Sequence, residues 1–314
     1  MDSGYLVRRL VVGAGTLLAA VTLVFLMIHL IPGDPVRAIL GDLYSPTTAE
    51  QLTTQLGLDK PIIQQYVDFM SRLARGDLGT SFLNRQPVLQ VVLENLHFTV
   101  QLAIVGILVT IALGIPAGII AALHRGKFAD MVMMSASLLG ASMPSFWLGI
   151  LLMIVFAVNL KWFPLLGTGD ADGPLGLVKA LVLPGITLGL RGAALTARVT
   201  RSSMLENLGQ DFTQTARAKG LSERVVVSRH AFRNALLPVV TVVGIDLGRM
   251  LGGAAIVEIV FSRPGLGTLL VNAVLDRDYP LIQGTFVVYL TLIILVNLAV
   301  DLVYARIDPR VSYQ

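Results

Sequence analysis

The amino-acid sequence predicts an all-α polytopic membrane protein with six transmembrane helices and a small helical subdomain between the first two. Of its 314 residues, 54% are hydrophobic and only 14% are charged, and the mean hydropathy is +0.75. Such a chain has too few polar residues to cover a surface that faces water, and several windows reach the roughly 20 apolar residues that span a bilayer. Basic residues also cluster in the short connections between these windows, which is typical of an oriented membrane protein.

Six spans are expected, at residues 10–31, 97–123, 131–158, 177–197, 235–260 and 281–303. The first follows Arg8 and Arg9 and is 22 residues long, which exceeds the roughly 7–15 residues of a cleaved signal sequence, so we expect it to remain as a span. An even number of spans places both termini on one side of the membrane. The connections after spans two and four and the C-terminal tail are basic, so that side is expected to be cytoplasmic.

This topology divides the chain into four parts. They are a cytoplasmic N-terminus with the first span (1–31), an extracytoplasmic helical subdomain (32–96), a five-span core (97–303) that includes a cytoplasmic loop (198–234), and a cytoplasmic tail (304–314). The segment 32–96 carries seven acidic and five basic residues, which fits the outer side.

Two helices are expected in the segment 32–96. Thr47 to Glu50 has the pattern of a capping box, and Gly57 is expected to end the first helix. The second is expected to begin at Pro61 and to end at Gly76, with the side chains of Ile62, Tyr66, Phe69, Met70 and Leu73 on one face. Two interpretations stay open, because this subdomain could pack on the outer ends of the spans or could contact a partner outside.

Several expected spans contain proline or glycine. Pro116 lies between Gly114 and Gly118 in the second span, Pro144 lies in the third, and the fourth contains Pro184 as well as Arg191. Such positions usually mark close helix packing or backbone groups that a neighbour satisfies. The alternative is that they line a pore.

The sequence excludes several functional classes. It has no cysteine, and its one Gly-Lys pair, Gly126-Lys127, has Ala121 where a phosphate-binding loop needs glycine. The four histidines are scattered, no metal-ligand spacing is present, and no nucleophile and base are paired, so we expect neither a metal site nor a catalytic residue. The net charge of only +4 argues against nucleic acid as a partner. Transport, conduction or assembly remain, and uphill transport would need an ion gradient or another chain.

A polar, basic segment interrupts the apolar pattern in the loop 198–234. It reads GQDFTQTARAKGLSERVVVSRHAFRNALLP from Gly209. Asp211 is expected to cap a short helix together with Gln214, Gly220 to end it, and Ser222 to cap a second helix that continues into the fifth span. Phe212, Ala216 and the stem of Lys219 are expected near one face. A short, capped helix of this kind suits docking into a groove of another protein, and the alternative is a loop attracted to anionic lipid.

This segment resembles a motif of known transporters. The order TARAKGLSE…RHAFRNALLPVVT is similar to the EAA loop of ABC-importer permeases, specifically the dipeptide/oligopeptide/nickel (DppB/OppB-like) group. Five further stretches resemble the same group in order. They are LIPGDPVRAILGD, LGLDKPIIQQYVDFMSRLARGDLGTSF, MPSFWLGILL, GGAAIVEIVFSRPGLGTLLVNAVLDRDYPLIQG and LVYARIDPRV.

The resemblance assigns residues to the loop motif. Gln214, Thr215 and Ala216 match the EAA element, Gly220 matches its glycine, and Leu237-Pro238 closes it. Gln214 departs from the acidic residue of the general pattern, and the distance from Gly220 to Pro238 is longer than in sugar-type permeases, as is usual in the peptide group. The ATPase-coupling residues expected from the resemblance are Asp211, Gln214, Thr215, Ala216, Arg217, Ala218, Lys219, Gly220 and Leu221.

The resemblance also implies an architecture and a set of partners. It implies the type I importer, MetI-like permease fold, in the inner or plasma membrane, in contact with lipid. The partners would be a second homologous permease (DppC/OppC-like), one or two ABC ATPase subunits that bind ATP and Mg²⁺, and an extracytoplasmic substrate-binding protein. This chain would hold no cofactor of its own. The implied substrates are dipeptides and oligopeptides, with nickel, glutathione or haem as alternatives within the family, and a self-sufficient secondary transporter or a membrane scaffold as alternatives outside it.

Ionisable residues within the spans are further candidates, because charges in a membrane are costly and usually functional. Asp246 and Arg249 in the fifth span are three residues apart and share a helix face. They are expected either to line the translocation path and contact the peptide or to pair with each other and lock the span. Glu258, Met143 and Pro144 complete the candidate path, with Glu258 favoured as a packing or gating residue.

Overall fold

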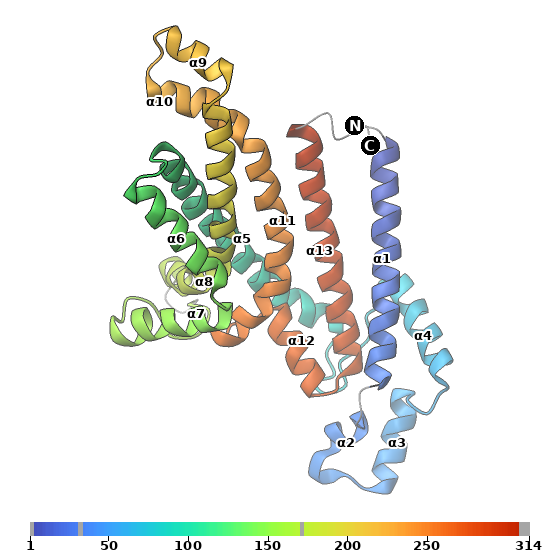
Figure 1. Ribbon diagram of the computed structural model, residues 1–314. Helices are drawn as coiled ribbons and strands as arrows, with labels where there is room; N and C mark the ends of the chain where they lie inside the picture. The colour runs from blue at the N-terminus through green and yellow to red at the C-terminus, as the bar shows by residue number, and fades with distance from the viewer. Residues whose placement is uncertain (1–2, 31–33, 170–172, 308–314) are drawn as a thin grey trace. The chain divides into compact units, whose positions relative to one another are not determined.

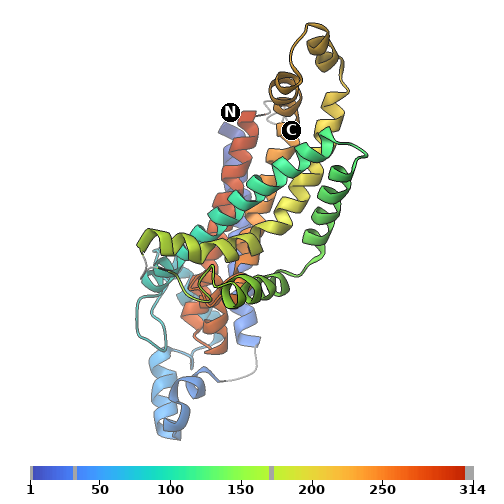
Figure 2. The ribbon, with the colours of Figure 1, turned by 90° about the vertical axis from the view of Figure 1, so that its left-hand side faces the viewer.

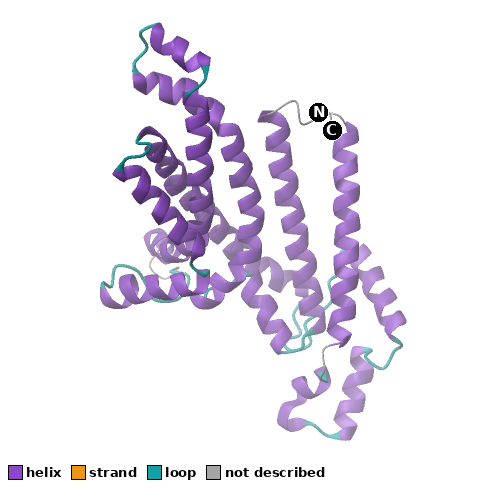
Figure 3. Ribbon diagram, in the orientation of Figure 1, coloured by secondary structure: helices purple, strands orange, loops and turns teal. Residues whose placement is uncertain are grey.

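The computed structural model describes residues 3–30, 34–169 and 173–307, and in these ranges the chain is almost entirely helical. Apart from one isolated bridge between Thr80 and Pro87, no strand pairing occurs in this described part (Figures 1 and 3). The expected all-α class is confirmed. Five helical stretches are long and apolar enough to cross a membrane, namely Val11–Leu30, Val88–Leu123, Gly173–Leu208, Glu223–Val260 and Tyr279–Leu302.

The third expected span, 131–158, is wrong as a single continuous helix. It consists of α6 (Phe128–Ser142), then α7 (Ser145–Leu152) continued by the π-helical η2 (Met153–Asn159), and the two parts are bent by 109° (Figure 2). The bend lies at Met143 and Pro144. Met143 has extended backbone angles, φ −76° and ψ 128°, because the ring of a following proline disfavours the helical conformation. If this bent pair crosses the membrane as one broken span, the total is six.

The chain divides into two compact units. One contains Thr99–Arg263 and the chain from Val296 onward, and the other contains the chain up to Phe98 together with Pro264–Leu295. The long helices α5 (Val88–Leu123) and α13 (Tyr279–Ile307) contribute residues to both units.

The first unit is built around α8 (Gly173–Leu208), which packs against α6 and α11 (Phe232–Val260). Part of α5 also lies close to α8. A Cβ atom added at Gly114 would lie 2.7 Å from the carbonyl oxygen of Ala193, and one added at Gly118 would lie 2.5 Å from that of Ala197. Close packing at these glycines, predicted from sequence, is therefore confirmed, since no side chain fits between the two backbones.

A charged clamp also joins two helices of this unit. The guanidinium group of Arg201 on α8 donates from Nε and Nη2 to the two carboxylate oxygens of Asp130 on α6, at 2.6 and 2.7 Å. The backbone N–H of Gly126 donates to the same carboxylate at 3.0 Å. The bidentate pair therefore holds the first turn of α6 against α8.

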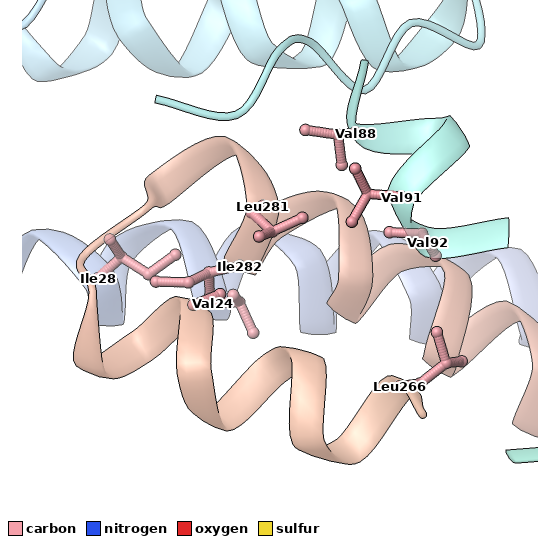
Figure 4. Close-up of a cluster of buried hydrophobic side chains, with 9 residues drawn as sticks. Val24, Ile28, Val88, Val91, Val92, Leu266, Leu281 and Ile282 are labelled. Atoms are coloured by element: carbon pink, nitrogen blue, oxygen red, sulfur yellow. The ribbon is translucent and has the colours of Figure 1, made fainter. Parts of the chain in front are cut away.

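The second unit joins α1 (Ser3–Leu30), the first turns of α5 and α13, and α12 (Leu266–Leu275) around one apolar cluster. Figure 4 shows this cluster, with side chains from all four helices. Val88 and Val92 of α5 and Leu266 of α12 are completely buried. This shared apolar cluster explains why helices that are far apart in sequence belong to the same unit.

The buried carboxylate of Asp278 connects two turns of this second unit. It accepts hydrogen bonds from the hydroxyl of Ser81, from the backbone N–H of Phe82 at 3.1 Å and from that of Leu281 at 3.2 Å. It therefore ties the chain before α5 to the start of α13.

The helices expected between the first two spans are present. They are α3 (Pro46–Leu56) and α4 (Ile62–Ala74). The segment also contains the short helix α2 (Pro35–Leu40) and the 3₁₀ turn η1 (Gly41–Leu43). The cap of α3 differs from the prediction, because Ser45 and Thr48 form the capping box in place of the Thr47–Glu50 pair. Gly57, with φ of 69°, ends α3 as expected.

The predicted apolar face of α4 is confirmed except at one residue. Phe69 is buried and packs on Phe25 of α1 with ring centroids 5.9 Å apart, and Tyr66 donates or accepts a hydrogen bond with Thr22 of α1 at 2.8 Å. Ile62 is instead exposed. The helix α4 therefore packs on α1 within the second unit, whereas α2 and α3 pack on each other.

Candidate functional site

The polar segment after α8 forms a short helix, α9 (Asp211–Ala218), followed by α10 (Glu223–Val225) and the π-helical η4 (Val226–Ala231), which continues into α11. Figure 1 shows α9 and α10 projecting beyond the ends of α8 and α11. The short amphipathic helix predicted from sequence is confirmed. It lies at the tip of the first unit.

Two residues anchor α9 to the rest of the unit. Thr213 and Ala216, three apart on one face, are buried, and the Thr213 hydroxyl lies within hydrogen-bonding distance of the carbonyl oxygens of Leu208 and Gln210, at 3.0 and 2.7 Å. Phe212, which the sequence placed near the same face as Ala216, does not share its burial. Phe212 is exposed, because the face that turns inward passes through Thr213 rather than through its neighbour.

The C-terminal end of α9 has the geometry of a Schellman motif. The N–H of Gly220 donates to the carbonyl oxygen of Arg217 at 2.9 Å, and the N–H of Leu221 donates to that of Ala216 at 3.3 Å. Gly220 has φ of 77°, in the left-handed region that this motif requires. The predicted glycine stop is confirmed.

The N-terminal end differs from the prediction. Gln210 occupies the N-cap position without a side-chain hydrogen bond, and Asp211 is the first helical residue. The acidic side chain is still favourable there, because it lies at the positive end of the helix dipole. Gln214 donates to the carbonyl oxygen of Gly209 at 3.4 Å, and Ser222 lies at the N-cap of α10 but makes no capping hydrogen bond.

An ion pair closes the turn around Gly220. The Nε and Nη2 atoms of Arg217 donate to the two carboxylate oxygens of Glu223, at 3.0 and 2.7 Å. The hydrogen bonds that Arg217 donates to the Glu223 carboxylate raise the pKa of Arg217. Sequence reasoning missed the role of Glu223. The acidic residue six positions after a basic one was visible, but only the turn at Gly220 brings the two together.

Most of the nine residues assigned to coupling are exposed. All of them are exposed except Ala216, whose side chain anchors the helix. The exposed members are Asp211, Gln214, Thr215, Arg217, Ala218, Lys219, Gly220 and Leu221. The exposed part of α9 is therefore mainly polar.

A charged cavity of about 660 Å³ lies elsewhere in the first unit. It is lined by the break between α6 and α7, by α8 and by α11, and its charged residues are Arg191, Arg198, Asp246 and Arg249. Met143 and Pro144 also line it. Four of the five candidate path residues thus meet at one cavity, together with two arginines that the sequence did not connect with them.

Asp246 is the buried member of this charged group. It is 9% exposed, and its Oδ2 atom has no hydrogen-bond partner. A Cβ atom at Gly192 would collide with this oxygen, so only glycine lets α8 approach α11 here. The nearby Thr110 hydroxyl donates to the carbonyl oxygen of Gly189 at 2.9 Å.

Glu258 lies outside the cavity. Its side chain is 1% exposed, and one carboxylate oxygen accepts a hydrogen bond from the hydroxyl of Thr99 at 2.6 Å. This places Glu258 in the packing between α11 and α5. Its geometry matches the packing role that the sequence favoured.

Comparison with known families decides the class of protein. A family described as binding-protein-dependent transport system inner membrane component matches residues 114–313, and a second family model, for the N-terminal part of such a membrane component, matches residues 3–103. The chain belongs to this transport family.

Its relatives in the family match over nearly their whole length. A Brucella suis protein, whose name places it in a peptide transport system, is 45% identical, with 98% of both chains covered. The dipeptide transport system permease protein of Alkalihalophilus pseudofirmus is 40% identical, covering 98% of this chain and 99% of the relative. The glutathione transport system permease protein of Escherichia coli is 41% identical, with 99% of each covered.

Solved structures of the same fold are more distant. An inward-facing MetNI methionine ABC transporter aligns with a TM-score of 0.58 at 17% identity, covering 70% of this chain and 97% of that chain. An amino acid ABC transporter with histidines aligns with a TM-score of 0.54 at 14% identity, covering 69% and 94%. The MetI-like permease fold expected from the sequence is confirmed.

Proposed function

We propose that this protein is the permease subunit of an ATP-driven importer of dipeptides and oligopeptides. It forms half of a translocation path in the cell membrane, and a second, homologous permease forms the other half. ATP and Mg²⁺ bind to partner ATPase subunits on the cytoplasmic side, and an extracytoplasmic binding protein delivers the substrate. Peptide is favoured because relatives at 40–45% identity carry peptide or dipeptide names.

The observation that carries the coupling role is the construction of α9. The helix is anchored by Thr213 and Ala216, ended by a Schellman motif at Gly220, and tied across its turn by Arg217 and Glu223. Its remaining surface is exposed at the tip of the first unit. Because both ends of α9 are fixed by these contacts, a force that an ATPase applies to its exposed polar surface would be transmitted to α8 and α11.

In this proposal the basic connections place α9 and both chain termini in the cytoplasm. The segment 32–96 then faces outside, where the binding protein docks. A substrate such as glutathione stays within the same proposal, since the Escherichia coli relative at 41% identity carries that name.

The coupling contact can be tested by site-directed labelling. The chain has no cysteine, so Thr215→Cys introduces a single reactive thiol on the exposed face of α9. We expect the partner ATPase subunits to protect this thiol from a maleimide reagent and to form a cross-link with it. Lys179→Cys, exposed near the start of α8, is the control and should react equally with and without the ATPases.

Equal labelling of Thr215→Cys in the presence and absence of the ATPases contradicts the coupling role. The substrate class is tested separately, by ATP-dependent uptake of a labelled dipeptide into vesicles that contain the complete transporter. Uptake that proceeds without ATPase subunits contradicts the importer assignment.

A further inference from the structure

The charged cavity between α6, α7, α8 and α11 has an excess of positive charge. Arg191, Arg198 and Arg249 line it together with one acidic residue, Asp246, which gives the lining a formal net charge of +2. Charged side chains within membrane helices are costly and are usually compensated. The protein's own residues compensate only part of this charge.

The arginines are available for a ligand. All three are exposed, and none of them donates a hydrogen bond to, or forms an ion pair with, another residue of the described chain. Arg201, on the same helix as Arg191 and Arg198, shows the contrast, because its Nε and Nη2 atoms both donate to the carboxylate of Asp130. The cavity arginines therefore differ from a structural ion pair.

A second observation points into the same cavity. The carboxylate of Asp246 is nine-tenths buried, yet its Oδ2 atom has no hydrogen-bond partner. A buried, unpaired carboxylate is tolerated where nearby cations balance it, and Arg191 and Arg249 lie in the same cavity. Asp246 thus reduces the positive charge of the site, so that an anion can bind there and still leave.

The geometry of the arginines suits a carboxylate. Arg191 and Arg198 are seven residues apart on α8, which is two turns, so they share a face about 10 Å apart along the helix. Arg249 approaches from α11. The planar guanidinium group binds a carboxylate in a bidentate manner, and a volume of about 660 Å³ lies within the roughly 300–1,000 Å³ typical of small-molecule sites.

We propose that this cavity binds the terminal carboxylate of the transported peptide, with Arg191 and Arg249 as the contacting groups and Asp246 as a nearby negative charge that partly balances them. Arg198 supplies a further cation two turns along α8. This inference rests on the proposed function and deepens it, because it makes the permease itself selective for substrates with a free carboxylate. Selectivity would then not reside in the binding protein alone.

The test compares a peptide with a free C-terminal carboxylate and the same peptide with a C-terminal amide. The complete transporter is reconstituted in phosphatidylcholine vesicles, and ATP-driven uptake is measured with the binding protein saturated by either peptide. Arg249→Gln and Arg191→Gln are each expected to reduce uptake of the free-acid peptide roughly 10-fold or more, as expected when a charge-assisted hydrogen bond is lost. Uptake of the amidated peptide should change little.

Two variants control this comparison. Lys179→Gln removes a positive charge from the same helix outside the cavity and should leave the ratio of the two uptake rates unchanged. Arg249→Lys keeps the positive charge but cannot bind a carboxylate in a bidentate manner, so it should give an intermediate ratio of the two uptake rates. Thermal stability of each variant complex confirms that it is folded and assembled.

Different results would refute the carboxylate site alone or the importer assignment as well. If Arg249→Gln and Arg191→Gln reduce uptake of both peptides equally, or of neither, the carboxylate site is refuted while the importer assignment stands. If the effect on the ratio appears only when anionic phosphatidylglycerol is added to the vesicles, the arginines bind lipid headgroups and the proposal also fails. If the unaltered transporter takes up neither peptide in an ATP-dependent manner, the proposed function and the carboxylate site both fail.

Discussion

Replacement of Gly220 by alanine is expected to loosen the C-terminal end of α9 and to weaken the coupling of ATP hydrolysis to uptake. Gly220 has φ of 77°, and a Cβ atom added there would meet no other atom within 4 Å. The free-energy cost of alanine at this position therefore comes from the left-handed backbone conformation and not from a clash with other atoms. A left-handed backbone costs a non-glycine residue about 1–2 kcal/mol, which favours opening of the Schellman motif by a factor of roughly 5–30.

Two measurements check this prediction. Hydrogen exchange at the N–H groups of Gly220 and Leu221, which donate to the carbonyl oxygens of Arg217 and Ala216, should become faster by that factor. ATP-driven uptake should fall at unchanged expression and assembly. Asparagine at this position should have a smaller effect, because it tolerates the left-handed region better than alanine does.

Gly209→Ala is the matched control in the same loop. Gly209 has no positive φ, and a Cβ atom there would be 3.6 Å from the carbonyl oxygen of Glu206, an ordinary contact. This variant should exchange and transport like the unaltered protein. The reasoning is refuted if Gly220→Ala keeps full protection and full uptake, or if Gly209→Ala is equally impaired, because the left-handed conformation would then not matter.

Three further predictions concern contacts within the first unit. Gly118→Ala should lower the melting temperature, because the new Cβ would lie 2.5 Å from a backbone carbonyl of α8, whereas Gly252→Ala, with nothing within 4 Å, should not lower it. Asp130→Asn should lower the melting temperature by leaving Arg201 without its bidentate partner, and adding Arg201→Gln to that variant should restore part of the loss in a double-mutant cycle. Glu223→Gln should hardly change the melting temperature, because its ion pair is exposed, but should reduce uptake; equal uptake would show that this ion pair does not stiffen α9.

Local features of the candidate site could be predicted from the sequence because they depend on neighbouring residues. The stop at Gly220 follows from the ability of glycine to adopt a positive φ, and the bounds of α9 follow from the polar segment between two apolar windows. The caps were less predictable. Ser45 and Gln210, rather than Thr47 and Asp211, occupy the N-cap positions, because several polar residues in a row can each serve as a cap.

The sequence by itself determined the membrane class, the apolar windows and the small amphipathic helix, since hydrophobic burial and backbone hydrogen bonding act along the chain. Only the tertiary structure decided how α6 and α7 diverge at Pro144 and which charges meet. Arg191 and Arg198 lie on α8 and Asp246 lies on α11, more than 45 residues away in sequence, and they meet because Gly192 permits the close approach of the two helices. The sequence proposed Asp246, Arg249, Met143 and Pro144 as path residues, but a crossing of two helices leaves no periodic pattern in either one, so it could not show that Arg191 and Arg198 line the same cavity.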